Sequence, residues 1–252
     1  MKKHKNIRIA VMTDIHGNLV ALNHALTAIE EQICDEIYVL GDSIAIGPYP
    51  KETLDLLLGV TEIKMVLGNH EIYYVKGLDP HPDYMQEGEV SHQKWVSEQL
   101  GEPYKKSIAS LPLSITKSFY GVTVTFQHYG ITDSSDEFHR FASPIRDPNG
   151  DELDKMFSDV NSDLIFYGHM HSPSQVSGKS RYVNPGSLGC SKDSNARVCI
   201  ADFYANGAYT INTILVPYDK ELVFKEMHNR KMPERDFICK AFFGEKVTTY
   251  NK

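Results

Sequence analysis

An alternation of apolar strands and amphipathic helices in the first 70 residues constrains the fold of this chain most. The apolar positions of residues 17–33 recur three and four apart, as in an amphipathic helix, with Asn18 as its N-cap. A shorter helix is expected around residues 51–58. Three apolar runs are typical of strands: residues 7–13, 36–40 and 62–67. Strands that alternate with helices pair in parallel, so we expect a parallel sheet here.

The second half of the chain has a different pattern. Residues 113–128 predict one β-hairpin, and residues 196–215 predict another. Antiparallel hairpins beside strand–helix–strand units favour an α/β fold, a four-layer α-β-β-α sandwich of two mixed sheets flanked by helices. We expect a single domain over residues 1–252. Within it we expect polar segments near the site at 72–112 and 130–152, and a C-terminal helical tail at 217–243.

Composition and charge exclude several classes of protein. The formal net charge of the 252 residues is −7, which argues against a nucleic-acid partner. No apolar run is long enough to span a membrane, and Asp14 interrupts the N-terminal apolar run too early for a signal peptide. The cysteines form no CxxC pair, so we expect neither a disulfide framework nor a thiolate zinc site, and we expect a cytoplasmic protein. They are Cys34, Cys190, Cys199 and Cys239.

Polar side chains with metal-binding chemistry follow the predicted strands directly. All offer oxygen or imidazole nitrogen, and such donors suit Mn, Fe, Zn or Co. There are too many for one mononuclear site, which uses about three protein ligands, so the set indicates two metals that share a carboxylate. Each residue alone has a simpler explanation, as a helix cap, a turn residue or a buried histidine. The set consists of Asp14, His16, Asp42, Asn69, His70, His128, His169 and His171.

Five short motifs resemble the sequence blocks of the calcineurin-like metallophosphoesterases. They are DIHGN at 14–18, GD at 41–42, GNHE at 68–71, FQHYG at 126–130 and GHMHSP at 168–173. The segments GDSIAIGPYP, VNPGSLGCSKD, VPYDKE and RKMPERDFICKAFFG are similar to the bacterial branch labelled diadenosine-tetraphosphatase-like, or to the small phosphodiesterases close to it. The resemblance covers essentially the whole chain.

The resemblance implies a ligand set for two divalent metal ions, with Mn favoured and Fe, Zn, Co or Ni as alternatives. It implies that Asp14, His16 and His171 hold one ion, that Asn69, His128 and His169 hold the second, and that Asp42 bridges them. Because Asp14 and His16 sit two residues apart, an extended backbone is expected to point both to one side. The resemblance also implies that a metal-bridging hydroxide attacks phosphorus and that His70 protonates the leaving group as general acid.

The sequence departs from the GDxxDRG motif that the serine/threonine phosphatases of this superfamily carry. Ala45 and Ile46 stand where those enzymes have the Asp that orients the catalytic histidine and the Arg that grips phosphate. Without that Arg, a dianionic phosphoprotein group lacks a well-matched partner, which argues against a protein phosphatase. The partner that orients His70 remains to be identified, because the neighbouring Glu71 is expected to point away from it.

Substrate contacts are predicted from residue type. Lys192, Arg146 and Arg181 are candidates for binding a substrate phosphate, each with a solvated surface residue as the alternative. Tyr73, Tyr84 and Phe138 offer surfaces on which a nucleobase can stack, with packing over the sheet as the alternative.

The favoured function is hydrolysis of phosphodiester or nucleotide pyrophosphate bonds in small molecules. A phosphomonoesterase is the enzymatic alternative, with a protein phosphatase or nuclease less favoured. A catalytically silent binding scaffold is the alternative outside the enzymes. The expected partner is a small phosphate ester or nucleotide, without membrane or nucleic acid, and the sequence leaves a homo-oligomer open.

Overall fold

Two five-stranded β-sheets pack face to face in the chain, as seen in a computed structural model that describes residues 6–244. The first sheet has the order β10 (Tyr209–Pro217), β9 (Asn195–Tyr204), β1 (Asn6–Met12), β2 (Glu36–Val39) and β3 (Ile63–Met65). The second has the order β4 (Ser114–Phe119), β5 (Val122–Gln127), β6 (Leu164–Phe166), β8 (Arg181–Asn184) and β7 (Ser174–Ser177). Each sheet combines three parallel strands with antiparallel ones, so both are mixed and the predicted fold class is confirmed.

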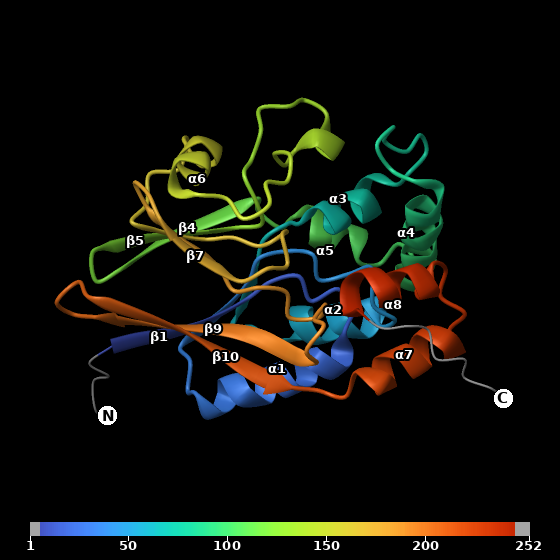
Figure 1. Cartoon of the computed structure of the whole chain (residues 1–252), viewed down its shortest axis with the longest axis horizontal. Helices are drawn as coiled ribbons and strands as arrows, with labels where there is room; N and C mark the ends of the chain where they lie inside the picture. Colours follow the sequence, from blue (N-terminus) through green and yellow to red (C-terminus); the bar gives the residue numbers. More distant parts are fainter. Residues whose placement is uncertain (1–5, 245–252) are drawn as a thin grey trace.

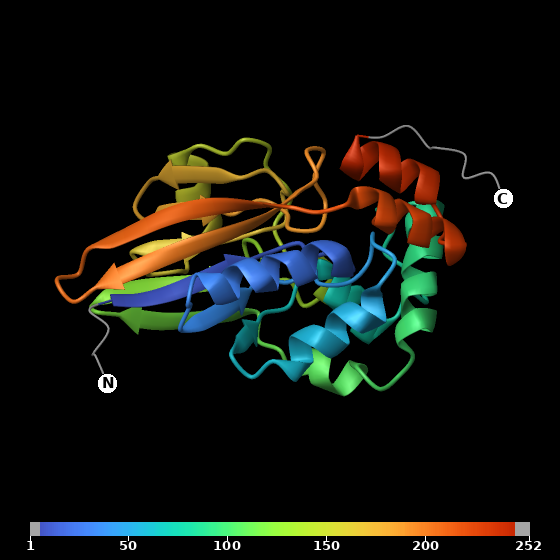
Figure 2. The ribbon, with the colours of Figure 1, turned by 90° about the horizontal axis from the view of Figure 1, so that it is seen from below.

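Helices cover the outer faces of both sheets. Figure 1 shows α1 against the first sheet and α6 against the second, and Figure 2 shows α1 lying along the strands of the first sheet. The helices are α1 (Leu19–Glu31), α2 (Pro50–Gly59), α3 (Asn69–Lys76), α4 (Glu87–Leu100), α5 (Lys105–Ala109), α6 (Gly150–Met156), α7 (Lys220–Asn229) and α8 (Arg235–Phe243), with a 3₁₀ turn, η1 (Glu137–His139). The result is the expected α-β-β-α layering.

The alternation of apolar side chains along β1 explains how the layers are held together. Ile9 and Val11 belong to the core between the two sheets. Ala10 and Met12 belong to the core between the first sheet and its helices. All four are fully buried, and burial of a side chain the size of Ile, Val or Met stabilises the fold by about 1.5–3 kcal/mol. A continuous apolar strand is therefore required here, because both of its faces are covered.

Most elements lie where the sequence predicts them. The side chain of Asn18 accepts a hydrogen bond from the backbone N–H of Ala21, which confirms it as the N-cap of α1. Both hairpins form, as β4–β5 and as β9–β10. The short strand β7 was not predicted, and the second hairpin extends to Pro217. Within residues 6–244, no helix is both long and apolar enough to cross a membrane.

The carboxyl ends of the parallel strands of both sheets meet at one end of the sandwich. Most of the polar residues picked out from the sequence lie on the turns after β1, β2, β5 and β6, and Asn69 and His70 begin α3 after β3. Figures 1 and 2 show α3, α4 and α8 gathered at the same end. The two sheets therefore bring their strand ends together over segments far apart in the sequence.

Candidate metal centre

The backbone at this end is held in left-handed turns. The φ angles of Asp14, His16 and Asp42 are 52°, 51° and 50°, and those of His169 and His171 are 68° and 58°. Side chains other than glycine adopt this region at a cost of about 1–3 kcal/mol each, and such residues cluster at functional sites. The expected extended backbone at Asp14 and His16 is therefore wrong. β1 ends at Met12, and tight turns rather than strand alternation aim these two side chains.

Hydrogen bonds between the two turns that follow β1 and β2 hold this conformation. The backbone N–H of His16 donates to the carbonyl of Asp42 at 2.9 Å, and the N–H of Gly17 donates to the carbonyl of Ser43 at 2.8 Å. Gly168 lets the turn after β6 approach β1, since a Cβ there would lie 2.0 Å from Oγ1 of Thr13. The rest of the structure therefore offsets the local backbone cost.

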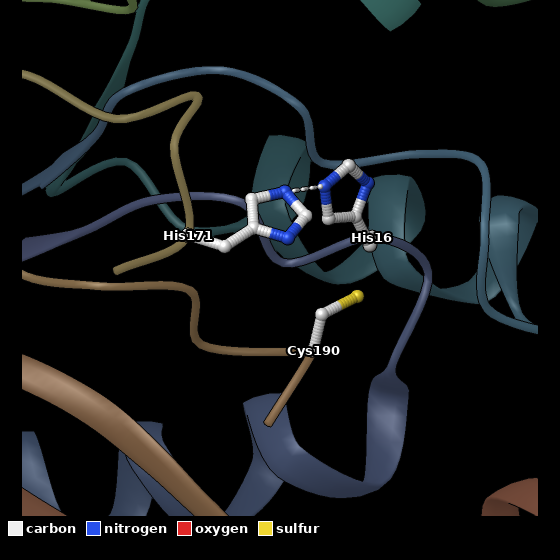
Figure 3. Close-up of side chains that lie close together, drawn as sticks. All are labelled: His16, His171 and Cys190. Carbon is white, nitrogen blue, oxygen red and sulfur yellow. Dashed lines mark hydrogen bonds between the residues drawn. The ribbon is translucent and has the colours of Figure 1, made fainter. Parts of the chain in front are cut away.

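His16, His171 and Asp14 form the first half of the site. Nε2 of His16 lies 2.9 Å from Nε2 of His171, and Oδ1 of Asp14 lies 3.7 Å from Nε2 of His171. Figure 3 shows one nitrogen of each imidazole ring directed toward the other ring, with the side chain of Cys190 directed toward the space beside them. One ligand atom from each of His16, His171 and Cys190 lies within 4.8 Å of the other two.

Asn69, His128 and His169 form the second half. Nε2 of His128 lies 3.1 Å from Oδ1 of Asn69 and 3.2 Å from Nδ1 of His169. Nδ1 of His169 lies 3.0 Å from the same amide oxygen. Three donor atoms from α3, from the end of β5 and from the turn after β6 thus converge on one point.

Asp42 stands between the two halves. Its Oδ2 lies 3.3 Å from Nε2 of His128 and 3.9 Å from Nε2 of His70. Asp42 belongs to one cluster of potential ligand atoms with His16 and His70, and to another with His128 and His169. It is the one carboxylate shared between these two clusters, and it is only 2% exposed.

The hydrogen-bonding pattern of the histidines tests whether this site fits a metal. Nδ1 of His16 and Nδ1 of His128 lie 3.2 and 2.8 Å from the backbone carbonyls of Ile44 and Leu40. A carbonyl only accepts, so each Nδ1 carries the proton and a neutral ring turns the Nε2 lone pair inward. Those lone pairs face other ring nitrogens and carboxylate or amide oxygens, which are also electron-rich. A bound cation offsets the repulsion between these atoms, so the residues fit divalent metal ions held by nitrogen and oxygen.

The pKa shifts of the buried site residues also indicate a place for a cation. Burial raises the pKa of Asp14 to about 7, against the influence of His128. Burial also opposes the ionised form of Asp42, but His128 and His70 hold the pKa of that carboxyl well below its usual value. Burial would lower the pKa of His128, but Asp42 raises it to about 9. Without a metal, a proton on His128 is therefore the cation that Asp42 attracts.

Burial favours the neutral form of His16, His169 and His171. Burial lowers the pKa of His16 well below the ordinary value, with His171 adding to the effect. Burial likewise lowers the pKa of His169 to about 3 and that of His171 to about 4. Neutral imidazole is the form that binds a metal, so burial prepares these rings for that role.

His70 has a partner that the sequence did not reveal. The side-chain amide of Gln93, on α4, donates a hydrogen bond to Nδ1 of His70, and Gln93 is 2% exposed. The backbone N–H of His70 donates to Oδ1 of Asp42 at 3.0 Å. The Gln93 hydrogen bond thus fixes the ring at Nδ1, with Nε2 directed toward Asp42. No sequence signal singles out Gln93, which lies 23 residues downstream on a different helix.

Glu71 has a structural role that differs from the role of the neighbouring His70. Its carboxylate accepts hydrogen bonds from the backbone N–H groups of Gly68, Asp42 and Ser43, at 2.9, 2.8 and 2.7 Å. These bonds tie the turn after β2 to the start of α3. As expected, Glu71 does not orient the ring of His70; it fixes the backbone that carries Asp42 and Asn69.

The structure separates the three predicted substrate contacts. Lys192 is exposed and follows Cys190 by two residues, with its side-chain carbons beside Gly244 at the end of α8. Arg146 is exposed on the loop whose Ile145 N–H donates to the hydroxyl of Tyr129, a ring 4.8 Å from His169. Arg181 begins β8 and pairs with the first residue of β6, at the end of the sheet away from the site. It donates to Ser177 and Gln175, so we do not retain it as a substrate contact.

The aromatic residues of the two polar segments form a group beside His70. The ring of Tyr73 contacts His70 edge-on at 5.6 Å, and its hydroxyl lies 3.3 Å from that of Tyr84. The Tyr84 hydroxyl donates to the carbonyl of Phe138 at 2.9 Å. Tyr73 is 6% exposed and therefore packs, whereas Tyr84 is 45% exposed and available to a ligand.

The sequence and the fold both match known proteins. The profile of the calcineurin-like phosphoesterase superfamily domain matches residues 7–206. An uncharacterized protein of Methanocaldococcus jannaschii is 29% identical over 244 residues, covering 90% of this chain and 94% of that protein.

Two solved structures share the fold. A hypothetical protein from Pyrococcus horikoshii has a TM-score of 0.78 at 21% identity, covering 96% of this chain and 100% of that one. A metallophosphoesterase from Sphaerobacter thermophilus has a TM-score of 0.70 at 24% identity, covering 90% and 95%. Because the family profile spans most of the chain, this protein belongs to the calcineurin-like phosphoesterase superfamily and is a metal-dependent phosphoester hydrolase.

Proposed function

We propose that the protein is a binuclear enzyme that hydrolyses phosphodiester or nucleotide pyrophosphate bonds of small molecules. The observation that carries this proposal is the position of Asp42, a buried carboxylate that lies within 4.8 Å of His16 in one half of the site and of His128 and His169 in the other. One metal would need only one of these halves. Two halves joined by a carboxylate match the binuclear arrangement used in phosphoester hydrolysis.

The contacts support an assignment of ligands to the two ions, for which manganese is our first choice. Asp14, His16 and His171 would hold one ion. Asn69, His128 and His169 would hold the other, and Asp42 would bridge them. When bound, two such ions activate a water molecule for attack on phosphorus and offset the charge that develops on the phosphoryl oxygens.

His70 would act as the general acid. Its Nε2 is directed toward Asp42, where a substrate phosphate would sit, while the Gln93 amide occupies Nδ1. The Gln93 amide holds the ring at Nδ1, so Nε2 is the nitrogen that faces the substrate position. From Nε2, His70 would give a proton to the departing alkoxide, a role worth about 10²–10⁴-fold in rate.

The surroundings of His70 favour a diester or pyrophosphate over a phosphoprotein. Ala45 and Ile46 occupy the places of the missing Asp and Arg; both are buried, and the N–H of Ile46 donates to Nε2 of His92 at 2.7 Å. These two residues offer no guanidinium group to a dianionic phosphate. A diester carries one negative charge fewer at the reacting phosphorus and depends less on such a group.

Turnover assays of the Mn²⁺-loaded protein test the proposal. The substrates are bis-p-nitrophenyl phosphate, p-nitrophenyl phosphate and diadenosine polyphosphates, and the variants are Asp42→Asn and, as a matched exposed carboxylate on α2, Asp55→Asn. We expect the diester or the dinucleotides to be turned over, Asp42→Asn to be inactive and Asp55→Asn to retain activity. Turnover of the monoester alone would replace the proposal with a phosphomonoesterase. No turnover of any substrate by protein with two bound ions would leave a binding scaffold.

A further inference from the structure

A thiol lies beside the first half of the metal centre, where the proposed ligand set contains only nitrogen and oxygen. Cys190 is 6% exposed, and its Sγ is within 4.8 Å of ring nitrogens of both His16 and His171. Figure 3 shows the Cys190 side chain directed toward the two rings. The other described cysteines, Cys34, Cys199 and Cys239, belong to no such cluster of potential ligands.

The segment that carries Cys190 is fixed to both of the chain segments that supply the histidines. The N–H of Ser187 donates to the carbonyl of His171 at 3.0 Å, and its hydroxyl donates to the carbonyl of Asp14 at 2.7 Å. The N–H of Cys190 in turn donates to that hydroxyl at 2.8 Å. The position of the sulfur therefore follows from the same hydrogen bonds that position Asp14 and His171.

Close packing reinforces this placement. The N–H of Gly189 donates to the carbonyl of Asp14 at 3.0 Å, and a Cβ at Gly189 would lie 1.8 Å from the carbonyl oxygen of Ile15. Only glycine lets the segment lie this close to the turn after β1. The residue before Cys190 is thus pressed against the backbone between Asp14 and His16.

We propose that Cys190 is a thiolate ligand of the ion held by Asp14, His16 and His171. An ion with imidazole nitrogen at about 2.1 Å and thiolate sulfur at about 2.3 Å holds these atoms no more than about 4.4 Å apart. The three donor atoms lie within 4.8 Å of one another, so the sulfur is placed close enough for a modest movement of its side chain to bring it to the ion. On binding, the S–H proton passes to solvent and the sulfur–metal bond forms.

The thiolate makes the two halves of the centre chemically different, a consequence that rests on the proposed binuclear function. The first half offers sulfur, two imidazoles, the Asp14 carboxylate and the shared carboxylate, a set that accepts zinc, cobalt or ferrous iron more readily than the second half does. The second half offers an amide oxygen, two imidazoles and the shared carboxylate, a harder set that accepts manganese. Cys190 therefore makes the first half the softer of the two sites.

Spectroscopy of the Co²⁺-loaded protein tests this without reference to activity. Wild-type protein at two bound Co²⁺ per chain should show a near-ultraviolet sulfur-to-cobalt charge-transfer band, which Cys190→Ser and Cys190→Ala lack. The buried control Cys199→Ser should keep the band. Affinity of the first site for Zn²⁺ should fall at least about tenfold in Cys190→Ser, with the Mn²⁺ affinity of the second site within about threefold of wild type.

The outcomes separate this inference from the proposed function. Two bound Co²⁺ ions without the band in wild-type protein would overturn the thiolate ligand and leave the binuclear site intact. A band that persists in folded Cys190→Ala would also overturn it. Failure of wild-type protein to bind Co²⁺ would contradict the binuclear centre itself, and the thiolate ligand with it.

Discussion

Nε2 of His128 lies 3.3 Å from Oδ2 of Asp42, a contact that joins the two sheets of the sandwich. Asp42 follows β2 of the first sheet and His128 follows β5 of the second, 86 residues later in the chain (128 − 42). Neither sheet alone contains the site. The packing of one sheet on the other, driven by the apolar layer between them, is what places the shared carboxylate against the second cluster of histidines.

The two histidines of the turn after β6 should serve different ions. His171 contacts His16, and His169 contacts His128 and Asn69. We expect His171→Ala and His169→Ala each to lower the affinity of one ion by at least about 10- to 100-fold while the other ion remains bound. Metal titration by isothermal calorimetry with two resolvable sites checks this. Loss of the same ion in both variants would contradict the assignment.

Gln93 should matter through His70, and only for substrates whose leaving group needs a proton. We expect Gln93→Ala and His70→Ala to slow hydrolysis of an alkyl or nucleoside diester, His70→Ala by about 10²–10⁴-fold. Esters of p-nitrophenol should be affected much less, because that leaving group departs as a stable anion. The exposed His24→Ala, on α1, is the control. Equal losses on both types of substrate would show that Gln93 and His70 act on binding or folding instead.

Glu71 should control stability more than chemistry. Replacing it with Gln puts an NH₂ group against backbone N–H donors that now share one carboxylate. An unsatisfied buried donor costs about 1–3 kcal/mol, and we expect the free energy of unfolding of Glu71→Gln to fall by that amount. Chemical denaturation of the metal-free protein measures it, with the exposed Glu30→Gln as control. An unchanged unfolding free energy would refute this role.

Acid should destabilise the metal-free protein. Burial lowers the pKa of His92 and His171 to about 4 and that of His169 to about 3, so between about pH 4 and 6.5 the unfolded chain binds more protons. His16, whose pKa burial also lowers, adds to this effect, whereas Asp14, whose pKa burial raises to about 7, opposes it together with Glu71 and Glu89, whose pKa values burial raises. The unfolding free energy should fall as pH falls below 6.5, by at most about 4 kcal/mol per pH unit. Denaturation from pH 7 to 5 should show the decrease; constant stability would contradict it.

Alkali should destabilise the metal-free protein for the opposite reason. Despite burial, Asp42 raises the pKa of His128 to about 9. Its contribution is fully present below pH 6.5 and is lost as pH rises through about 9. Metal ions displace this proton, so the metal-loaded protein should lack the alkaline decrease. The same loss of stability with and without bound metal would show that His128 is not a ligand.

The sequence predicts the strands and the residues at their ends because both depend on local pattern. Apolar runs such as 7–13 fix where β1 lies, and the polar residue that follows each run must fall on a turn. Local pattern does not predict the conformation of the turn. Asp14 and His16 adopt left-handed backbone because hydrogen bonds to the turn after β2 hold them there, and periodicity carries no information about such contacts.

Residues that act through tertiary contacts could not be predicted from the sequence. Gln93 meets His70 only because α4 packs beside α3, and Cys190 meets His16 only because its segment is bound to the turn after β1. Spacing rules for cysteine consider neighbours along the chain, so a cluster of two histidines and one cysteine from three segments is invisible to them. Arg181 shows the converse error, since residue type alone says nothing about which end of a strand faces the site.

Anomalous diffraction from a crystal of the Mn²⁺-loaded protein tests the central claim most directly. The two-ion account predicts two anomalous peaks, one on each side of the Asp42 carboxylate. One peak should be contacted by Asp14, His16 and His171, and the other by Asn69, His128 and His169. A single peak, or two peaks that do not share Asp42, would contradict the binuclear centre.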